Sequence, residues 1–176
     1  MTGFSLALDY TIENEGGFSN VSGDRGGATR WGITREEASR WRRCSVSVEE
    51  MRSFPFEEAK AIYKAWYWSA LNLDGVEDVP IAICLFDLGV VRGIGIPGHY
   101  AQRICSRHSL PLVEDGHIGP KTVEALNQIN PNLFINDFSH MAHDGFVEIT
   151  RDNPSQRIFL SGWLNRANRY MSLMQT

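Results

Sequence analysis

The sequence predicts a mainly α-helical protein of two helical lobes, with one small β-hairpin near the N-terminus. Three observations support this fold class. Apolar residues recur every three or four positions along most of the 176 residues. Many of these helical segments begin with a capping residue or a proline. Only the glycine-rich segment Phe18–Ile33 lacks the helical period, so it is the only region expected to form strands.

The first helix is expected from Phe4 to Glu15, where one helical face is apolar and ends in a carboxylate. Gly16 and Gly17 then stop this helix. The glycine density that follows is typical of a turn-rich hairpin or loop. The residues that share the helical face are Phe4, Ala7, Leu8, Thr11 and Glu15.

The middle of the chain contains four helix signals. The stretches that begin at Thr34 and at Ser47 both fit the capping box, in which a hydroxyl residue is followed three positions later by Glu, so a helix begins after each. An aromatic-rich helix is expected from Phe56 to about Ala70. Asp78–Val91 has a capping Asp, an early Pro and then almost only apolar residues, which predicts a buried central helix joining the two lobes.

The second lobe is expected to be entirely helical. It follows a glycine- and proline-rich bend, and a tight turn at Asp115-Gly116 separates its first two helices. Each of its helical patterns has a proline near the first turn, where the missing N–H does no harm. These patterns are Pro97–His108, Pro120–Ile129, Pro131 to about Thr150, and Pro154–Met171.

Composition and charge exclude several classes of function. The net charge of −4 provides no general basic field for nucleic acid, and no apolar run is long enough to cross a bilayer. Three widely spaced cysteines, Cys44, Cys84 and Cys105, fit reduced cytosolic thiols better than a disulfide framework. The N-terminus lacks a basic region and Asp9 interrupts its short apolar run, so we expect synthesis in the cytoplasm without a cleavable secretion signal.

The candidate residues for acid–base catalysis are Glu15 and Asp24. The expected helix end and apolar face both disfavour an ionised Glu15, and a raised pKa suits a general acid. Asp24 lies nine positions later among glycines, in a polar setting, and Thr29 is placed to orient water or to bond a carboxylate. Two carboxylates in unlike environments suit glycoside hydrolysis. Taken singly, each of the three also fits an ordinary structural role in a solvated helix end or a turn.

Other candidates are weaker. Tyr67 and Trp68 are rim candidates, because flat rings stack on sugars, whereas Trp163 is expected to be a packing anchor. His140 and His143 share a helical face, but without a third distant ligand they do not predict a metal site. The pair Cys105 and His108 similarly lacks the supporting residues of a thiol protease.

The motifs Glu15-Gly-Gly-Phe-Ser-Asn, Asp24-Arg-Gly-Gly-Ala-Thr29 and Trp31-Gly-Ile-Thr34 resemble the N-terminal signature of glycoside hydrolase family 108. This family comprises lysozyme-like N-acetylmuramidases of phage endolysins and secretion systems. The resemblance implies that Glu15 is the catalytic acid, with supporting roles for Asp24 and Thr29. From the same signature and from "LFDLGVV" we expect substrate contacts by Phe18, Asn20, Gly27, Trp31 and Asp87.

Later motifs, including "EDGHIGPKTVEAL", resemble the peptidoglycan-binding region of that family. One departure is Val91, where relatives tend to carry Asn. The resemblance implies a catalytic region at residues 1–91 and a peptidoglycan-binding helical region at residues 92–176. It also implies no metal or organic cofactor.

The expected function is cleavage of the β-1,4 bond between N-acetylmuramic acid and N-acetylglucosamine by a monomer acting on glycan strands in the periplasm. A non-catalytic peptidoglycan adaptor and a stem-peptide amidase or peptidase are the alternatives. The sequence does not distinguish phage lysis from protein secretion, or retention from inversion of the anomeric centre.

Overall fold

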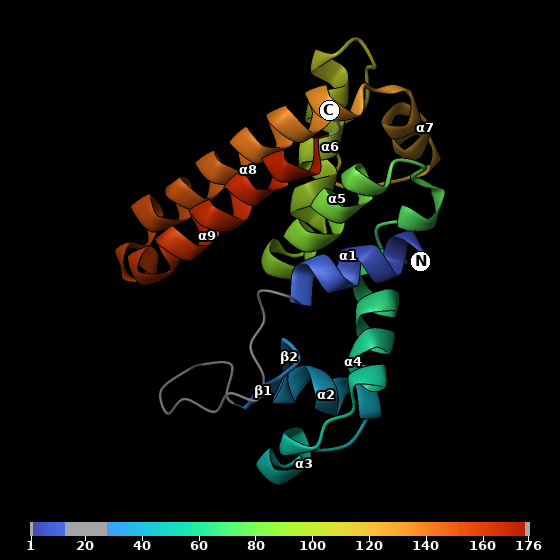
Figure 1. The fold of residues 1–176 in the computed structure, drawn as a ribbon. Helices are drawn as coiled ribbons and strands as arrows, with labels where there is room; N and C mark the ends of the chain where they lie inside the picture. The colour runs from blue at the N-terminus through green and yellow to red at the C-terminus, as the bar shows by residue number, and fades with distance from the viewer. Residues whose placement is uncertain (1, 13–27, 175–176) are drawn as a thin grey trace.

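The computed structural model describes residues 2–12 and 28–174, and it is mainly helical with one small hairpin near the N-terminus, as predicted (Figure 1). At its centre, α1 (Gly3–Ile12) packs against α5 (Val79–Arg92). The predicted α1 face is confirmed over the described residues, because Ala7 and Thr11 are fully buried and Phe4 and Leu8 nearly so. This face joins the N-terminal elements to the rest of the core.

Helix α5 is the buried central helix that its apolar sequence predicts. The Asp78 side chain caps it by accepting a hydrogen bond of 2.9 Å from the Ile81 N–H, and Pro80 lies in the first turn. Every residue from 81 to 89 is buried. Because α5 also packs on α6 and α8, it connects the early part of the chain to the late helices.

The hairpin consists of β1 (Thr29–Arg30) and β2 (Ile33–Thr34), and it holds the only strands in the described ranges. The strands are antiparallel, with Thr29 opposite Thr34. At the turn, Trp31 and Gly32 have φ angles of 56° and 75°, the positive pair that a type I′ turn requires. Two residues therefore reverse the chain without splaying the strands.

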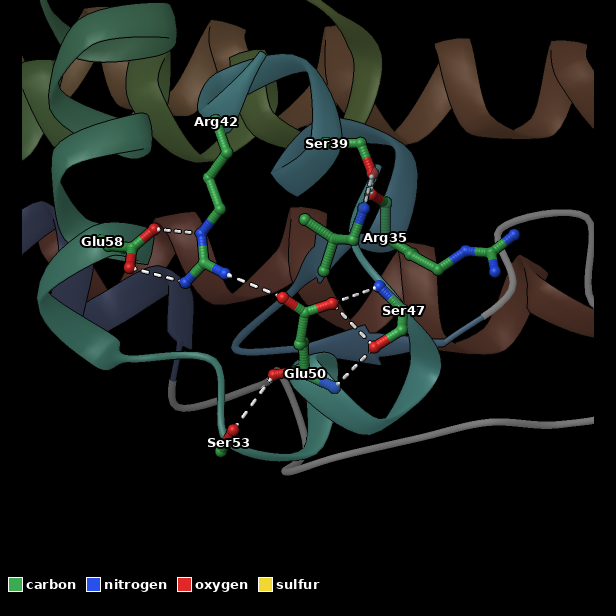
Figure 2. A network of polar contacts seen from close by, with 8 residues as sticks. Arg35, Ser39, Arg42, Ser47, Glu50, Ser53 and Glu58 are labelled. Atoms are coloured by element: carbon green, nitrogen blue, oxygen red, sulfur yellow. Dashed lines mark hydrogen bonds and ion pairs between the residues drawn. The ribbon is translucent and has the colours of Figure 1, made fainter. Parts of the chain in front are cut away.

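Helices α2 (Arg35–Arg42) and α3 (Val48–Arg52) begin at the two predicted capping boxes. Figure 2 shows how Glu50, which completes the second box with Ser47, also faces Arg42 at 3.9 Å. The Arg42 guanidinium binds both carboxylate oxygens of Glu58 at 2.7 and 2.9 Å. This network joins α2, α3 and α4 (Phe56–Tyr63), which lies beside α2 and below α1 in the view of Figure 1.

The expected helix from Phe56 to about Ala70 differs from the structure in its second half. After α4 the chain widens into the π-helix η1 (Lys64–Trp68), and a 3₁₀ turn, η2 (Leu73–Gly75), follows. The wider turn leaves the Trp68 indole only 3% exposed, in edge contact with Phe4 and Phe86. An apolar run specifies helix but does not reveal such a change of pitch, because tertiary packing decides it.

The late helices all form where the proline-led patterns place them, and α8 and α9 pack together as a long helical pair (Figure 1). Gly98 permits one close approach, since a Cβ there would collide with the backbone carbonyl of Gly116. In the described part of the chain, no helix combines the length and apolar character needed to span a membrane. The late elements are α6 (Gly95–Arg107), α7 (Pro120–Gln128), α8 (Pro131–Asp152), η3 (Pro154–Gln156), α9 (Arg157–Arg169) and η4 (Tyr170–Leu173).

Candidate active site

Half of the predicted site residues belong to the described part of the chain. Glu15, Asp24, Phe18, Asn20 and Gly27 lie outside the described residues. The structure does place the two elements that flank this segment, α1 before it and the hairpin after it. It also places the remaining candidates, which are Thr29, Trp31, Tyr67, Trp68 and Asp87.

Trp31 fixes the tip of the hairpin. Its indole N–H donates to the Phe54 carbonyl at 3.0 Å, and its ring meets the Phe56 ring edge to face at 5.2 Å between centroids. Its own carbonyl accepts a hydrogen bond of 2.9 Å from the Tyr63 hydroxyl. The half-buried indole therefore holds the hairpin against the chain around α4, and this anchoring keeps Thr29 in a defined place.

A short polar chain lies beside Thr29. Its cross-strand neighbour Thr34 donates through its hydroxyl to Glu37 at 2.8 Å, and Tyr67 donates to the other carboxylate oxygen at 3.3 Å. Burial, and then the Glu37 charge and hydrogen bond, raise the pKa of Tyr67 to about 12. Tyr67 thus stays protonated and bonds the same carboxylate that accepts from Thr34 of the hairpin. The sequence signalled Glu37 only as a capping residue, although its carboxylate links the hairpin to Tyr67.

The sequence-based roles of Trp68 and Asp87 change in the structure. The Trp68 indole N–H donates to Asp74 at 2.7 Å while its ring packs in the core, so it does not lie at a rim. Asp87 is fully buried on α5, where solvent and sugars do not reach it. We therefore retain neither residue as a direct substrate contact. The family-like motif around Asp87 identified a special residue, but its burial was not visible from an apolar helix alone.

The Asp87 carboxylate is the centre of a network that joins four elements. It accepts hydrogen bonds from the Thr11 hydroxyl on α1 at 2.9 Å and from the Tyr170 hydroxyl on η4 at 2.7 Å. Arg166 on α9 binds it through two nitrogens, each at 2.8 Å. Charge-assisted and bidentate bonds of this kind fix geometry strongly. Thr11 lies four residues before Glu15, so the network holds the last turns of α1 that lead to the predicted acid.

Two aromatic hydroxyls around this carboxylate remain protonated. Burial raises the pKa of Tyr170 well above its usual value, and the Asp87 charge adds to the effect. The same causes, in the same order, raise the pKa of Tyr10 on α1. The Arg169 guanidinium lies over the Tyr10 ring, 3.9 Å from its centroid. The end of α9 thus contacts α1 directly as well as through Asp87.

The other candidate clusters have structural partners. His108 lies 3.0 Å from Asp137, and burial raises the pKa of the Cys105 thiol to about 11, which does not suit a nucleophile. Across residues 2–12 and 28–174, no group of three or more His, Cys, Asp or Glu side chains has the proximity for a metal site. Asp115 shapes its turn by accepting from the His117 N–H at 2.9 Å, as an Asx turn does.

Comparison with known proteins identifies both parts of the chain. Residues 8–93 match the family described as Glycosyl hydrolase 108. The N-terminal part of the chain is therefore a glycosyl hydrolase 108 domain. Its lysozyme-like, mainly helical fold is the one that the family resemblance implied. Residues 97–168 match the family described as Predicted Peptidoglycan domain, so the chain combines a glycosyl hydrolase domain with a predicted peptidoglycan domain.

A solved structure is similar to this chain over nearly its whole length. It is described as the structure of Brucella abortus SagA, and it is 25% identical with a TM-score of 0.78. The similarity covers 96% of this chain and 91% of the Brucella chain, so it extends across both matched domains. A search of curated proteins finds no match.

Proposed function

We propose that this glycosyl hydrolase is an N-acetylmuramidase that cleaves the β-1,4 bond between N-acetylmuramic acid and N-acetylglucosamine in peptidoglycan. The observation that carries the proposal is the glycosyl hydrolase 108 match over residues 8–93, which contains the Glu15-Gly-Gly motif. The adjoining Predicted Peptidoglycan domain supports peptidoglycan as the polymer. The setting is the periplasmic cell wall, during phage lysis or muramidase-dependent protein secretion.

Glu15 acts as the general acid in this proposal. It protonates the oxygen of the leaving sugar as the glycosidic bond breaks, and Asp24 stabilises the positive sugar ring or activates water. Thr29 assists from β1, where the anchored hairpin holds it opposite Thr34. The buried Asp87–Thr11 contact supports the role of Glu15, because it holds α1 in place four positions before this residue in the sequence.

One assay on purified sacculi separates this proposal from its alternatives. A muramidase releases new reducing ends without new free amines, whereas an amidase or peptidase releases amines only. A binding adaptor sediments with the sacculi and releases neither product. Release of amines without reducing ends would overturn the proposal.

A further inference from the structure

The outer face of α9 carries a groove that the proposed reaction does not use. Its cavity has a volume of about 550 Å³. The lining residues all belong to one helix and follow helical spacing along one side of it. They are Ile158, Phe159, Gly162, Trp163, Asn165, Arg166 and Arg169.

The groove exposes large apolar side chains that a solvated helix face normally lacks. Ile158 is 80% exposed and Phe159 is 49% exposed, and they are adjacent in the chain. Single exposed apolar residues are common, but neighbouring ones that line a hollow indicate a binding surface. The exposed Ile158–Phe159 pair therefore indicates a binding surface on α9.

The aromatic part of the groove is held rigidly. Trp163 stacks on Phe146 of α8 with 5.4 Å between ring centroids and an interplanar angle of 22°. Phe159 packs beside Trp163 at 5.8 Å. A ring that is already fixed loses little conformational entropy when a flat ligand face stacks on it.

The polar part of the lining suits an N-acetylated saccharide. Asn165 provides an exposed amide, with both a donor and an acceptor for hydroxyl and acetamido groups. The charged lining residues are Arg166, whose charge the buried Asp87 carboxylate compensates, and Arg169, and no carboxylate is among the described lining residues to repel the polar groups of a glycan. Arg166 binds Asp87, and the Arg169 guanidinium lies over the Tyr10 ring of α1, so one end of the groove is next to α1.

We propose that the α9 groove is a glycan subsite, in which the peptidoglycan strand lies with a sugar face on Phe159 and its polar groups toward Asn165. The inference rests on the proposed function for the identity of the polymer. The strand would extend from the α1 end of the groove along α9, which runs away from α1 beside α8 (Figure 1). Residues 157–168 of this face also belong to the matched Predicted Peptidoglycan domain.

The test measures binding without turnover, by sedimentation of the Glu15→Gln protein with purified sacculi and with glycan strands stripped of their stem peptides. The groove variant is Ile158→Ser with Phe159→Ser. The matched control is Val113→Ser with Leu133→Ser, because these residues are 79% and 49% exposed and do not line the groove. We expect the groove variant to bind both polymers about tenfold more weakly or worse, and the control to bind as the parent protein does.

Equal binding by the groove and control variants would overturn the proposal. A loss confined to sacculi that still carry stem peptides would also overturn it, because the ligand would then be peptide. So would light scattering that shows a dimer dissociated by the groove variant with sacculus binding unchanged. Reducing-end release by the wild type is scored separately: the groove stands if only this release fails, and the muramidase stands if only the binding difference fails.

Discussion

Removal of the Asp87 carboxylate is expected to cost much of the stability of the fold. The side chain is fully buried and accepts bonds from Thr11, Tyr170 and, twice, from Arg166. Asp87→Ala leaves the Arg166 guanidinium, 12% exposed, without its counter-charge. Breaking a buried pair by removing one partner costs about 3–5 kcal/mol. That loss is a large share of the ~5–15 kcal/mol by which domains are stable.

The assay is equilibrium unfolding in urea at pH 7, followed by tryptophan fluorescence. Asp87→Ala is compared with Glu148→Ala, whose carboxylate pairs with Arg151 at 3.1 Å but is 64% exposed. Such a surface pair contributes about 0–1 kcal/mol. Addition of Arg166→Met to Asp87→Ala should recover about 0.5–3 kcal/mol relative to the sum of the single losses, because it removes the uncompensated charge. A loss for Asp87→Ala no larger than that for Glu148→Ala would refute the reasoning.

Three further predictions test individual contacts elsewhere in the structure. Burial raises the pKa of Tyr67 to about 12, so the folded protein keeps a proton that the unfolded chain releases near pH ~10. The free energy of unfolding should therefore fall as the pH rises above ~10. Tyr67→Phe should make this fall shallower when urea unfolding is measured across this pH range. Gly98→Ala should lower the free energy of unfolding by about 1–3 kcal/mol, because the new Cβ would force the backbones at positions 98 and 116 apart. Gly95→Ala is the control, because a Cβ there meets open space and should cost nothing measurable. Equal urea unfolding midpoints for the two variants would contradict this prediction. Thr34→Ala should lower stability by about 0.5–2 kcal/mol through loss of the α2 cap, and thermal unfolding measures it; an unchanged melting temperature would count against the cap.

The helix pattern of this chain is largely readable from its sequence. Asp78, Thr34 and Ser47 predict helix starts because their side chains satisfy free amides there, and the structure confirms all three. The π-helix at Lys64–Trp68 was not predictable, because the same residues fit an α-helix or a π-helix. The packing of the Trp68 ring against Phe4 and Phe86 decides between the two. Local signals thus identify elements, while packing sets their details.

The motifs of the candidate site are visible in the sequence, whereas the buried contacts around Asp87 are not. The apolar face of α1 correctly placed Thr11 inside, but nothing in the sequence indicated that its hydroxyl meets Asp87, 76 positions later. Arg166 and Tyr170 were missed for the same reason, since each lies on a late helix far along the chain from its partner. The signal that existed was a lone carboxylate in an otherwise apolar helix, because a buried charge requires a partner.

The most direct test of the proposed reaction is the chemical identity of the fragments that the protein releases from purified sacculi. Mass spectrometry after borohydride reduction should show reduced muramic acid at the new chain ends for the wild type. Glu15→Gln should give no such fragments while its urea unfolding midpoint stays unchanged. Fragments ending in reduced glucosamine, or undiminished release by folded Glu15→Gln protein, would contradict muramidase action through this carboxyl group.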